Sequence, residues 1–202
     1  MTYELFIRHE KTLMFPPIVD GVTIEWERQG QPGKLTFEIV KTANLSFEEG
    51  DACRFSVDGT PLFCGFVFDK SRSGDNPDVI KVTVYDQLYY LKNKDTYIYS
   101  NKTATEVVKM IAEDFGLNLG TLEDTGYKIA SRTEENTSLF DIIQNALDET
   151  LKAKTEMYVL YDKAGKLTLT NISNMKLGLV INEDTAGNYD YKTSIAKNIQ
   201  QN

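Results

Sequence analysis

Cys53-Arg-Phe-Ser-Val-Asp-Gly-Thr-Pro-Leu-Phe-Cys-Gly-Phe66 is the stretch that decides the fold of the N-terminal half. Asp58-Gly59 is a strong signal for a two-residue hairpin turn, with apolar residues recurring on both sides. Such a turn predicts a register that sets Cys53 directly opposite Cys64, both on one apolar inward face. The sequence therefore predicts antiparallel β-structure built around this hairpin.

Further runs in the N-terminal half alternate apolar and polar residues. Alternation with a period of two residues predicts strands with one buried face and one solvent-exposed face. Turn-forming residues separate the runs, for example Gly30 to Gly33 and Ser73 to Pro77. Several short strands without a long helical pattern favour a small barrel, so residues 1–95 are predicted to form an antiparallel β-barrel domain. The apolar positions of these runs are Val22, Ile24, Trp26, Leu35, Phe37, Ile39, Ile80, Val82 and Val84.

In the second half of the sequence, the apolar residues are spaced as in α-helices. Apolar residues recur every three or four positions after Thr103, which forms a capping-box pair with Glu106, and Gly116 suits the end of that helix. The same spacing predicts a second helix from near Ser138 to about Ala153. A hairpin follows at 157–170. Residues 96–185 are therefore predicted to form a small two-helix α+β domain, which makes the whole chain α+β.

The net charge and the hydropathy pattern argue against a DNA-binding protein and against a membrane protein. The 202 residues include 22 basic and 30 acidic side chains, for a net charge of −8. Nucleic-acid binders usually have the opposite balance, so no specific DNA binding is expected. No stretch approaches the roughly 20 continuous apolar residues of a membrane span, and the N-terminus lacks a signal-peptide pattern. We expect a protein made in the cytoplasm, without a membrane partner.

The sequence has few residues that could form a catalytic or metal-binding site. His9 is the only histidine, expected in an exposed loop, and one histidine with two core-facing cysteines is too few for a zinc site. The predicted register allows a disulfide, but a cytoplasmic origin favours free thiols. No catalytic, cofactor or metal site is predicted, and hydrolysis is the minor alternative. Several carboxylates are expected to be solvated at turns and helix ends. A pair of them that acts as in a glycosidase is the alternative. These residues are Glu48, Glu49, Asp51, Glu123, Asp124, Glu134, Glu135, Asp148 and Glu149.

Five tyrosines crowd one short region. Tyrosine is favoured at interfaces because its ring is apolar and its tip is polar. We expect these side chains to form a contact between domains or between subunits. Stacking on sugars or bases is the alternative. The five are Tyr85, Tyr89, Tyr90, Tyr97 and Tyr99.

Several collinear blocks resemble the XkdQ/YqbQ family of PBSX-type prophage proteins. The longest block runs from Val84 to Thr103. The others begin with Gly50-Asp51 and Asp58-Gly-Thr-Pro-Leu-Phe-Cys-Gly65, and continue with Leu139-Phe-Asp-Ile-Ile-Gln-Asn-Ala-Leu-Asp148, Tyr158-Val-Leu-Tyr-Asp162 and Gly165-Lys-Leu-Thr-Leu169. The resemblance spans roughly residues 1–195.

That resemblance implies a non-enzymatic baseplate hub of a contractile tail or bacteriocin. Such hubs form trimeric rings between tail tube and central spike, and each subunit contributes two tube-like β-barrels. By this analogy 1–95 is the first barrel, 96–185 is an inserted domain, and 186–202 leads toward a second barrel. The implied partners are two further copies, tube and spike proteins, and DNA only in passage through the lumen. The location implied is the virion tail, assembled in the host cytoplasm.

A second resemblance gives a rival function. Tyr97-Ile-Tyr99, the predicted helix 103–115 and Gly116-Leu117 resemble the opening of a LysM repeat, a small βααβ module that binds glycans. The first part of the α+β domain is therefore LysM-like, and peptidoglycan binding is the alternative function.

Overall fold

The computed structural model describes residues 1–19 and 21–178, so the expected linker at 186–202 lies outside the described residues. The first half forms one seven-stranded sheet, ordered β2-β1-β5-β6-β7-β4-β3. Its antiparallel strands are β1 (Tyr3–His9), β2 (Thr12–Met14), β3 (Thr23–Glu25), β4 (Lys34–Val40), β5 (Ala52–Val57), β6 (Thr60–Ser73) and β7 (Asn76–Tyr85).

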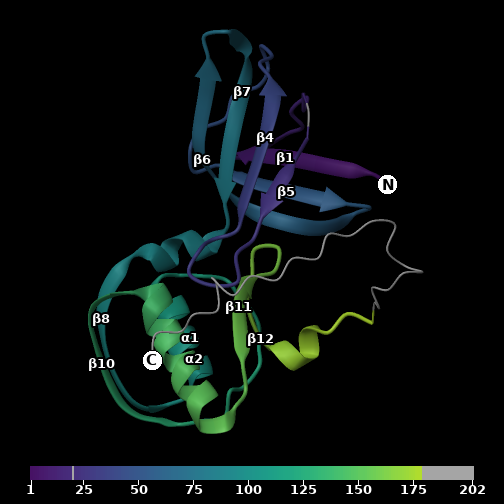
Figure 1. Ribbon diagram of the computed structural model, residues 1–202. Coiled ribbons are helices and arrows are strands. Elements are labelled where there is room, and N and C mark those ends of the chain that lie inside the picture. The colour runs from purple at the N-terminus through teal and green to yellow at the C-terminus, as the bar shows by residue number, and fades with distance from the viewer. Residues whose placement is uncertain (20, 179–202) are drawn as a thin grey trace, which may run out of the picture.

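The sheet is sharply folded along its longest strand. The first part of β6 pairs with β5, and from Phe66 onward β6 pairs with β7. In Figure 1, β1 and β5 consequently run across the direction of β4, β6 and β7. Thirteen buried residues, from Leu5 to Val84, form one cluster, which we call the N-terminal core. The predicted inward positions Leu35, Phe37 and Ile39 are at most 2% exposed, which confirms the alternation there.

The prediction of a β-barrel is wrong, because the sheet is open between β2 and β3. The chain between these edge strands passes through Pro16 and Pro17, which have no N–H to donate. Beyond the two prolines, Ile18 forms an isolated antiparallel bridge with Ile39 of β4. Among the described residues, β2 pairs only with β1, and β3 only with β4.

The predicted hairpin exists, but its register is wrong beyond the turn. Val57 lies opposite Thr60 as expected, and a bulge then shifts the pairing by one residue. Cys53 therefore faces Gly65, whereas Cys64 pairs with Arg54 on the outer face. Both thiols are free, as expected, but only Cys53 is buried in the core.

The second half packs two helices between two small sheets (Figure 1). A second cluster of seventeen buried residues, from Leu88 to Leu169, is separate from the first; we call it the C-terminal core. The sheets have the orders β10-β8 and β11-β12-β9. The elements are η1 (Gln87–Lys92), β8 (Lys94–Lys102), α1 (Ala104–Asp114), β9 (Leu119–Leu122), β10 (Ile129–Ser138), α2 (Leu139–Lys154), β11 (Tyr158–Asp162), β12 (Leu167–Asn171) and η2 (Ile172–Met175).

Local sequence signals for the helices are confirmed. Thr103 accepts from the Glu106 N–H, and the Glu106 carboxylate accepts in return from the Thr103 N–H, so the capping box is complete. Gly116 follows α1 with a φ of +63°. Ser138 caps α2 by accepting from the Asp141 N–H. The α+β class with two α-helices is therefore correct.

The LysM-like interpretation does not extend through this region. A LysM repeat requires a second helix directly after the first. Leu119–Leu122 instead forms strand β9, which pairs in parallel with β12, and the next helix begins only at Leu139.

Candidate functional site

The five predicted contact tyrosines fall into different environments. Tyr97 and Tyr99 belong to the C-terminal core, at 9% and 3% exposure. The Tyr97 hydroxyl donates a hydrogen bond to Asp114 Oδ2 at 2.7 Å. These two side chains therefore pack inside the C-terminal core.

Tyr85 and Tyr89 meet at the boundary between the two cores. Their ring centroids lie 5.0 Å apart, and Phe68 contacts both, at 5.3 Å from Tyr85 and 4.1 Å from Tyr89. The Lys92 ammonium lies 5.3 Å from the Tyr89 ring centroid. Because Phe68 is on β6 and Tyr89 is on η1, this aromatic group joins the folded sheet to the second half. Tyr90 is 41% exposed and lies outside the group.

A buried polar junction lies beside these rings. Asp86 is 1% exposed, and its two carboxylate oxygens accept from the N–H groups of Gly33 and Leu88, at 2.9 and 3.0 Å. Gly33 precedes β4, whereas Leu88 packs in the C-terminal core. One carboxylate thus bonds to backbone that leads into both cores.

Gln87 extends the junction into the second half. Its amide donates to Asp162 Oδ2 at 2.7 Å and to the Asn118 carbonyl at 3.2 Å, and its side-chain oxygen accepts from the Asn118 N–H. Asp162 also accepts from the Gly165 N–H. Segments far apart in sequence are therefore held together by partly buried hydrogen bonds, and sequence reasoning missed all of these side chains.

Burial changes the acidity of this junction. Desolvation, followed by the charge of Asp162, raises the pKa of Asp86 to about 7, although the two backbone N–H groups oppose the rise. Desolvation also raises the pKa of Asp162. The junction therefore holds two carboxyl groups for which ionisation is costly.

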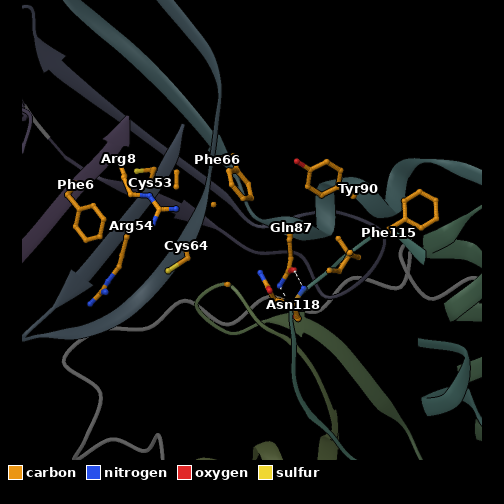
Figure 2. Close-up of a pocket in the computed structure, with 15 residues that line it drawn as sticks. Phe6, Arg8, Cys53, Arg54, Cys64, Phe66, Gln87, Tyr90, Phe115 and Asn118 are labelled. Atoms are coloured by element: carbon orange, nitrogen blue, oxygen red, sulfur yellow. Dashed lines mark hydrogen bonds between the residues drawn. The ribbon is translucent and has the colours of Figure 1, made fainter. Parts of the chain in front are cut away.

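A cleft lies between the outer face of the folded sheet and the second half (Figure 2), and its volume is about 560 Å³. The sheet supplies Phe6, Arg8 and Arg54 together with the outward-facing Cys64. The opposite side is formed by the exposed Tyr90 and by the loop after α1. The residues of that loop are Phe115, Gly116, Leu117 and Asn118.

Exposed apolar side chains gather along the β2 edge and the segment after it. Their exposures are 51% for Leu13, 62% for Phe15, 38% for Ile18 and 47% for Val19. A second hollow, of about 650 Å³ and mostly apolar, lies beside Trp26 and β11. Trp26 is itself 57% exposed, an unusual position for so large an apolar ring.

Two expectations about ionisable residues are wrong in detail. His9 ends β1, and its Nδ1 lies 2.9 Å from Asp51 Oδ2, so it is not in a free loop. Glu134 is 6% exposed in the middle of β10, where Arg132 and Asn145 contact it. Pairing with β8 and α2 buries this acid, which the sequence alone places at a solvated turn.

Within residues 1–19 and 21–178, no group of three or more His, Cys, Asp or Glu side chains is arranged to bind a metal. No helix in that part of the chain combines the length and apolarity needed to cross a membrane.

Comparison with known proteins gives a consistent set of relatives. The YQBQ-like family model matches residues 22–201. YqbQ of Bacillus subtilis strain 168 is 35% identical over 203 residues, covering 95% of this chain and 60% of its own length. The phage-like element PBSX protein XkdQ of the same strain is 34% identical over 174 residues, covering 82% of this chain and 52% of XkdQ. The chain thus spans roughly half to three-fifths of these relatives.

Two solved structures share the fold. The 43 kDa tail protein of prophage MuSo2 from Shewanella oneidensis has a TM-score of 0.65 at 18% identity, covering 83% of this chain and 52% of that one. A tail protein from Neisseria meningitidis MC58 has a TM-score of 0.64 at 11% identity, with coverages of 84% and 50%. At these identities the likeness concerns the fold.

Proposed function

The chain belongs to the YqbQ-like family, and from that premise we propose that it is a non-enzymatic structural part of a phage-tail-like particle. Its place is the baseplate hub of a contractile tail, where three copies of the full-length protein form a ring between the tail tube and the central spike. The support for a tail role is the set of relatives: a PBSX protein and two tail proteins that share the fold.

The open sheet edge is the observation that carries the ring proposal. β2 is only three residues long, and one side of it has no strand partner among the described residues. Leu13 and Phe15 are more than half exposed there. Unpaired strand edges bind other chains readily, and a closed ring satisfies every such edge by symmetry. We therefore assign this edge to contact with a neighbour in the ring.

The rest of the proposal follows from the ring. Residues 1–95 and 96–185 act as two units, of which the first forms the ring and the second is an inserted domain. DNA passes through the lumen without specific recognition, which suits a chain with a net charge of −8. The particle is assembled in the host cytoplasm. The proposed ring between tail tube and spike is the same whether the particle is a phage or a bacteriocin.

The test is the copy number of the full-length protein in solution and in purified tail particles. Native mass spectrometry between micromolar and millimolar concentration is expected to give a trimer, and electron microscopy of particles is expected to place three copies at the baseplate. A monodisperse monomer throughout, together with particles that contain no ring, rejects the proposal.

A matched pair of variants ties the ring to the sheet edge. Leu13→Lys with Phe15→Lys places two charges on the exposed edge and is expected to abolish the trimer. Ile98→Lys changes a side chain that is 73% exposed on β8, in the other half, and is expected to leave the trimer intact. Equal behaviour of the two variants contradicts the assignment of this edge.

A further inference from the structure

The outer face of the folded sheet carries two arginines in adjacent rows. Phe6 pairs with Arg54, which pairs with Cys64; in the next row, Arg8 pairs with Ala52. The backbone positions of residues placed diagonally on neighbouring strands lie about 7–8 Å apart, so the side chains of Arg8 and Arg54 leave the sheet from neighbouring points of the same face. Both line the cleft of Figure 2.

Neither arginine has a carboxylate within ion-pair distance in the described part of the chain, although the charge of Asp162, beside Gln87 and Gly165, reaches Cys64 in the same cleft. No ion pair found there includes Arg8 or Arg54. Arg54 donates to the Ser56 hydroxyl at 3.2 Å and lies 5.5 Å from the Phe6 ring centroid. None of the residues that line the cleft is acidic. The cleft is therefore a cationic site on a chain whose net charge is −8.

The opposite side of the cleft is largely apolar. Tyr90, Phe115 and Leu117 line it there. Successive side chains of an extended segment point in opposite directions, and residues i and i+2 lie about 6.5–7 Å apart. An extended segment that alternates acid, apolar and acid residues would therefore place both carboxylates on the arginines and its apolar side chain on the other side.

This chain presents such a segment on its own surface. Glu25, Trp26 and Glu27 are all exposed, and they stand at the end of β3, an edge strand of the sheet. Trp26 is 57% exposed. Tryptophan beside charged residues is typical of the residues that dominate binding at protein interfaces. The Glu25–Lys34 pair at 3.0 Å is largely solvent-exposed and so opposes a new contact only weakly.

We propose that the cleft between Arg8, Arg54 and Phe115 receives Glu25-Trp26-Glu27 of a second copy of this chain. The contact joins two different surfaces, which is the head-to-tail arrangement that builds a ring. Each guanidinium binds one carboxylate, and Trp26 packs on the apolar side of the cleft. The inference rests on the proposed ring for its biological role, but the binding itself can be measured without a ring.

The test uses a fluorescein-labelled peptide of residues 21–27, Gly-Val-Thr-Ile-Glu-Trp-Glu, titrated with the full chain by fluorescence anisotropy. Saturable binding is expected, and Arg8→Ala and Arg54→Ala are each expected to weaken it about tenfold or more, as the loss of a charge-assisted hydrogen bond implies. The matched control is Arg72→Ala, which removes the same charge from an exposed site that does not line the cleft. A peptide with both glutamates replaced by glutamine is expected to bind as weakly as the arginine variants.

The possible outcomes separate this inference from the ring proposal. No binding of the peptide, or equal binding to the Arg8, Arg54 and Arg72 variants, overturns the inference even where the full-length protein is a trimer. Specific peptide binding by a protein that self-associates into species other than a trimer supports the inference and overturns the ring, whereas a protein that stays monomeric above the peptide Kd overturns both. A short single-stranded oligonucleotide that competes with the peptide at physiological salt would assign the cleft to nucleic acid and also overturn the inference.

Discussion

The Cβ position of Gly65 lies against the carbonyl oxygen of Tyr85, at the point where β6 leaves β5 and joins β7. A side chain there would collide with the backbone of the neighbouring strand and with the Phe63 ring. Glycine is therefore required for the two parts of the sheet to approach each other at this corner.

Gly65→Ala is expected to lower the free energy of unfolding by about 2–3 kcal/mol, because the added methyl forces the backbone of β7 to move. Urea unfolding followed by circular dichroism measures the effect. Gly74→Ala is the control, since nothing lies within 4 Å of its Cβ position and its φ is not positive. Equal midpoints for the two variants would contradict the close approach at the corner.

The stability of the junction is expected to fall as the pH rises from about 4 to 7. The pKa of Asp86 is about 7 in the folded chain, against an ordinary 3.8, so within this window the folded state holds a proton that the unfolded state releases. Unfolding free energy then decreases with pH, by at most about 1.4 kcal/mol per pH unit from this group. Urea unfolding measured at several pH values tests it.

Asp86→Asn is expected to flatten that pH dependence, because an amide does not ionise in this range. It also loses stability at low pH, since one of the two backbone N–H groups then faces the amide NH₂ instead of an acceptor. Asp78→Asn, at an exposed position, is expected to keep the slope of the unaltered chain. A slope unchanged by Asp86→Asn would rule out this carboxyl as its source.

Tyr99→Phe is expected to stabilise the chain by about 1–3 kcal/mol. The Tyr99 hydroxyl is buried and has no hydrogen-bond partner among the described residues, so removing it removes an uncompensated desolvation cost. Tyr97→Phe is the matched comparison, because it breaks the bond to Asp114 and is expected to destabilise by about 1 kcal/mol. Thermal unfolding of both variants gives the sign of each effect.

The two cysteines are expected to react with iodoacetamide at different rates in the native chain. Cys64 is partly exposed in the cleft, whereas Cys53 is 2% exposed in the N-terminal core, where burial raises its pKa strongly. Mass spectrometry should find label on Cys64 first, and Cys64→Ser should abolish the early phase. Denatured, unreduced protein should give two reactive thiols, and none would indicate a disulfide.

Turn and cap signals in the sequence predicted the local structure well. Asp58-Gly59 specified the hairpin turn, and Thr103 and Ser138 specified where the helices begin. These signals depend on residues only a few positions apart, which a single sequence records directly. The bulge between Phe55 and Ser56 was missed because the turn signal fixes only the pairing next to the turn, whereas the register farther along depends on how the whole sheet packs.

Strand β10 and the polar junction were missed for the same physical reason. The strand is largely polar, and its buried residues Ile129 and Glu134 give no alternation that would predict it. Asp86, Gln87 and Asp162 become a site only when the start of η1 meets the end of β11, and nothing in the sequence spacing records that meeting. Of the predicted tyrosines, the sequence could not separate those at the boundary from those in the C-terminal core.

The parallel pairing of β9 with β12 affects the order of events during synthesis. Leu119 and Leu169 sit in the two partner strands, with α2 and β11 between them in the chain. The ribosome must therefore release everything through β12 before this small sheet can close, and the helix sides that face this sheet stay uncovered until then. The folded sheet at the N-terminus uses only earlier residues, so it can form first and serve as the surface on which the later half assembles.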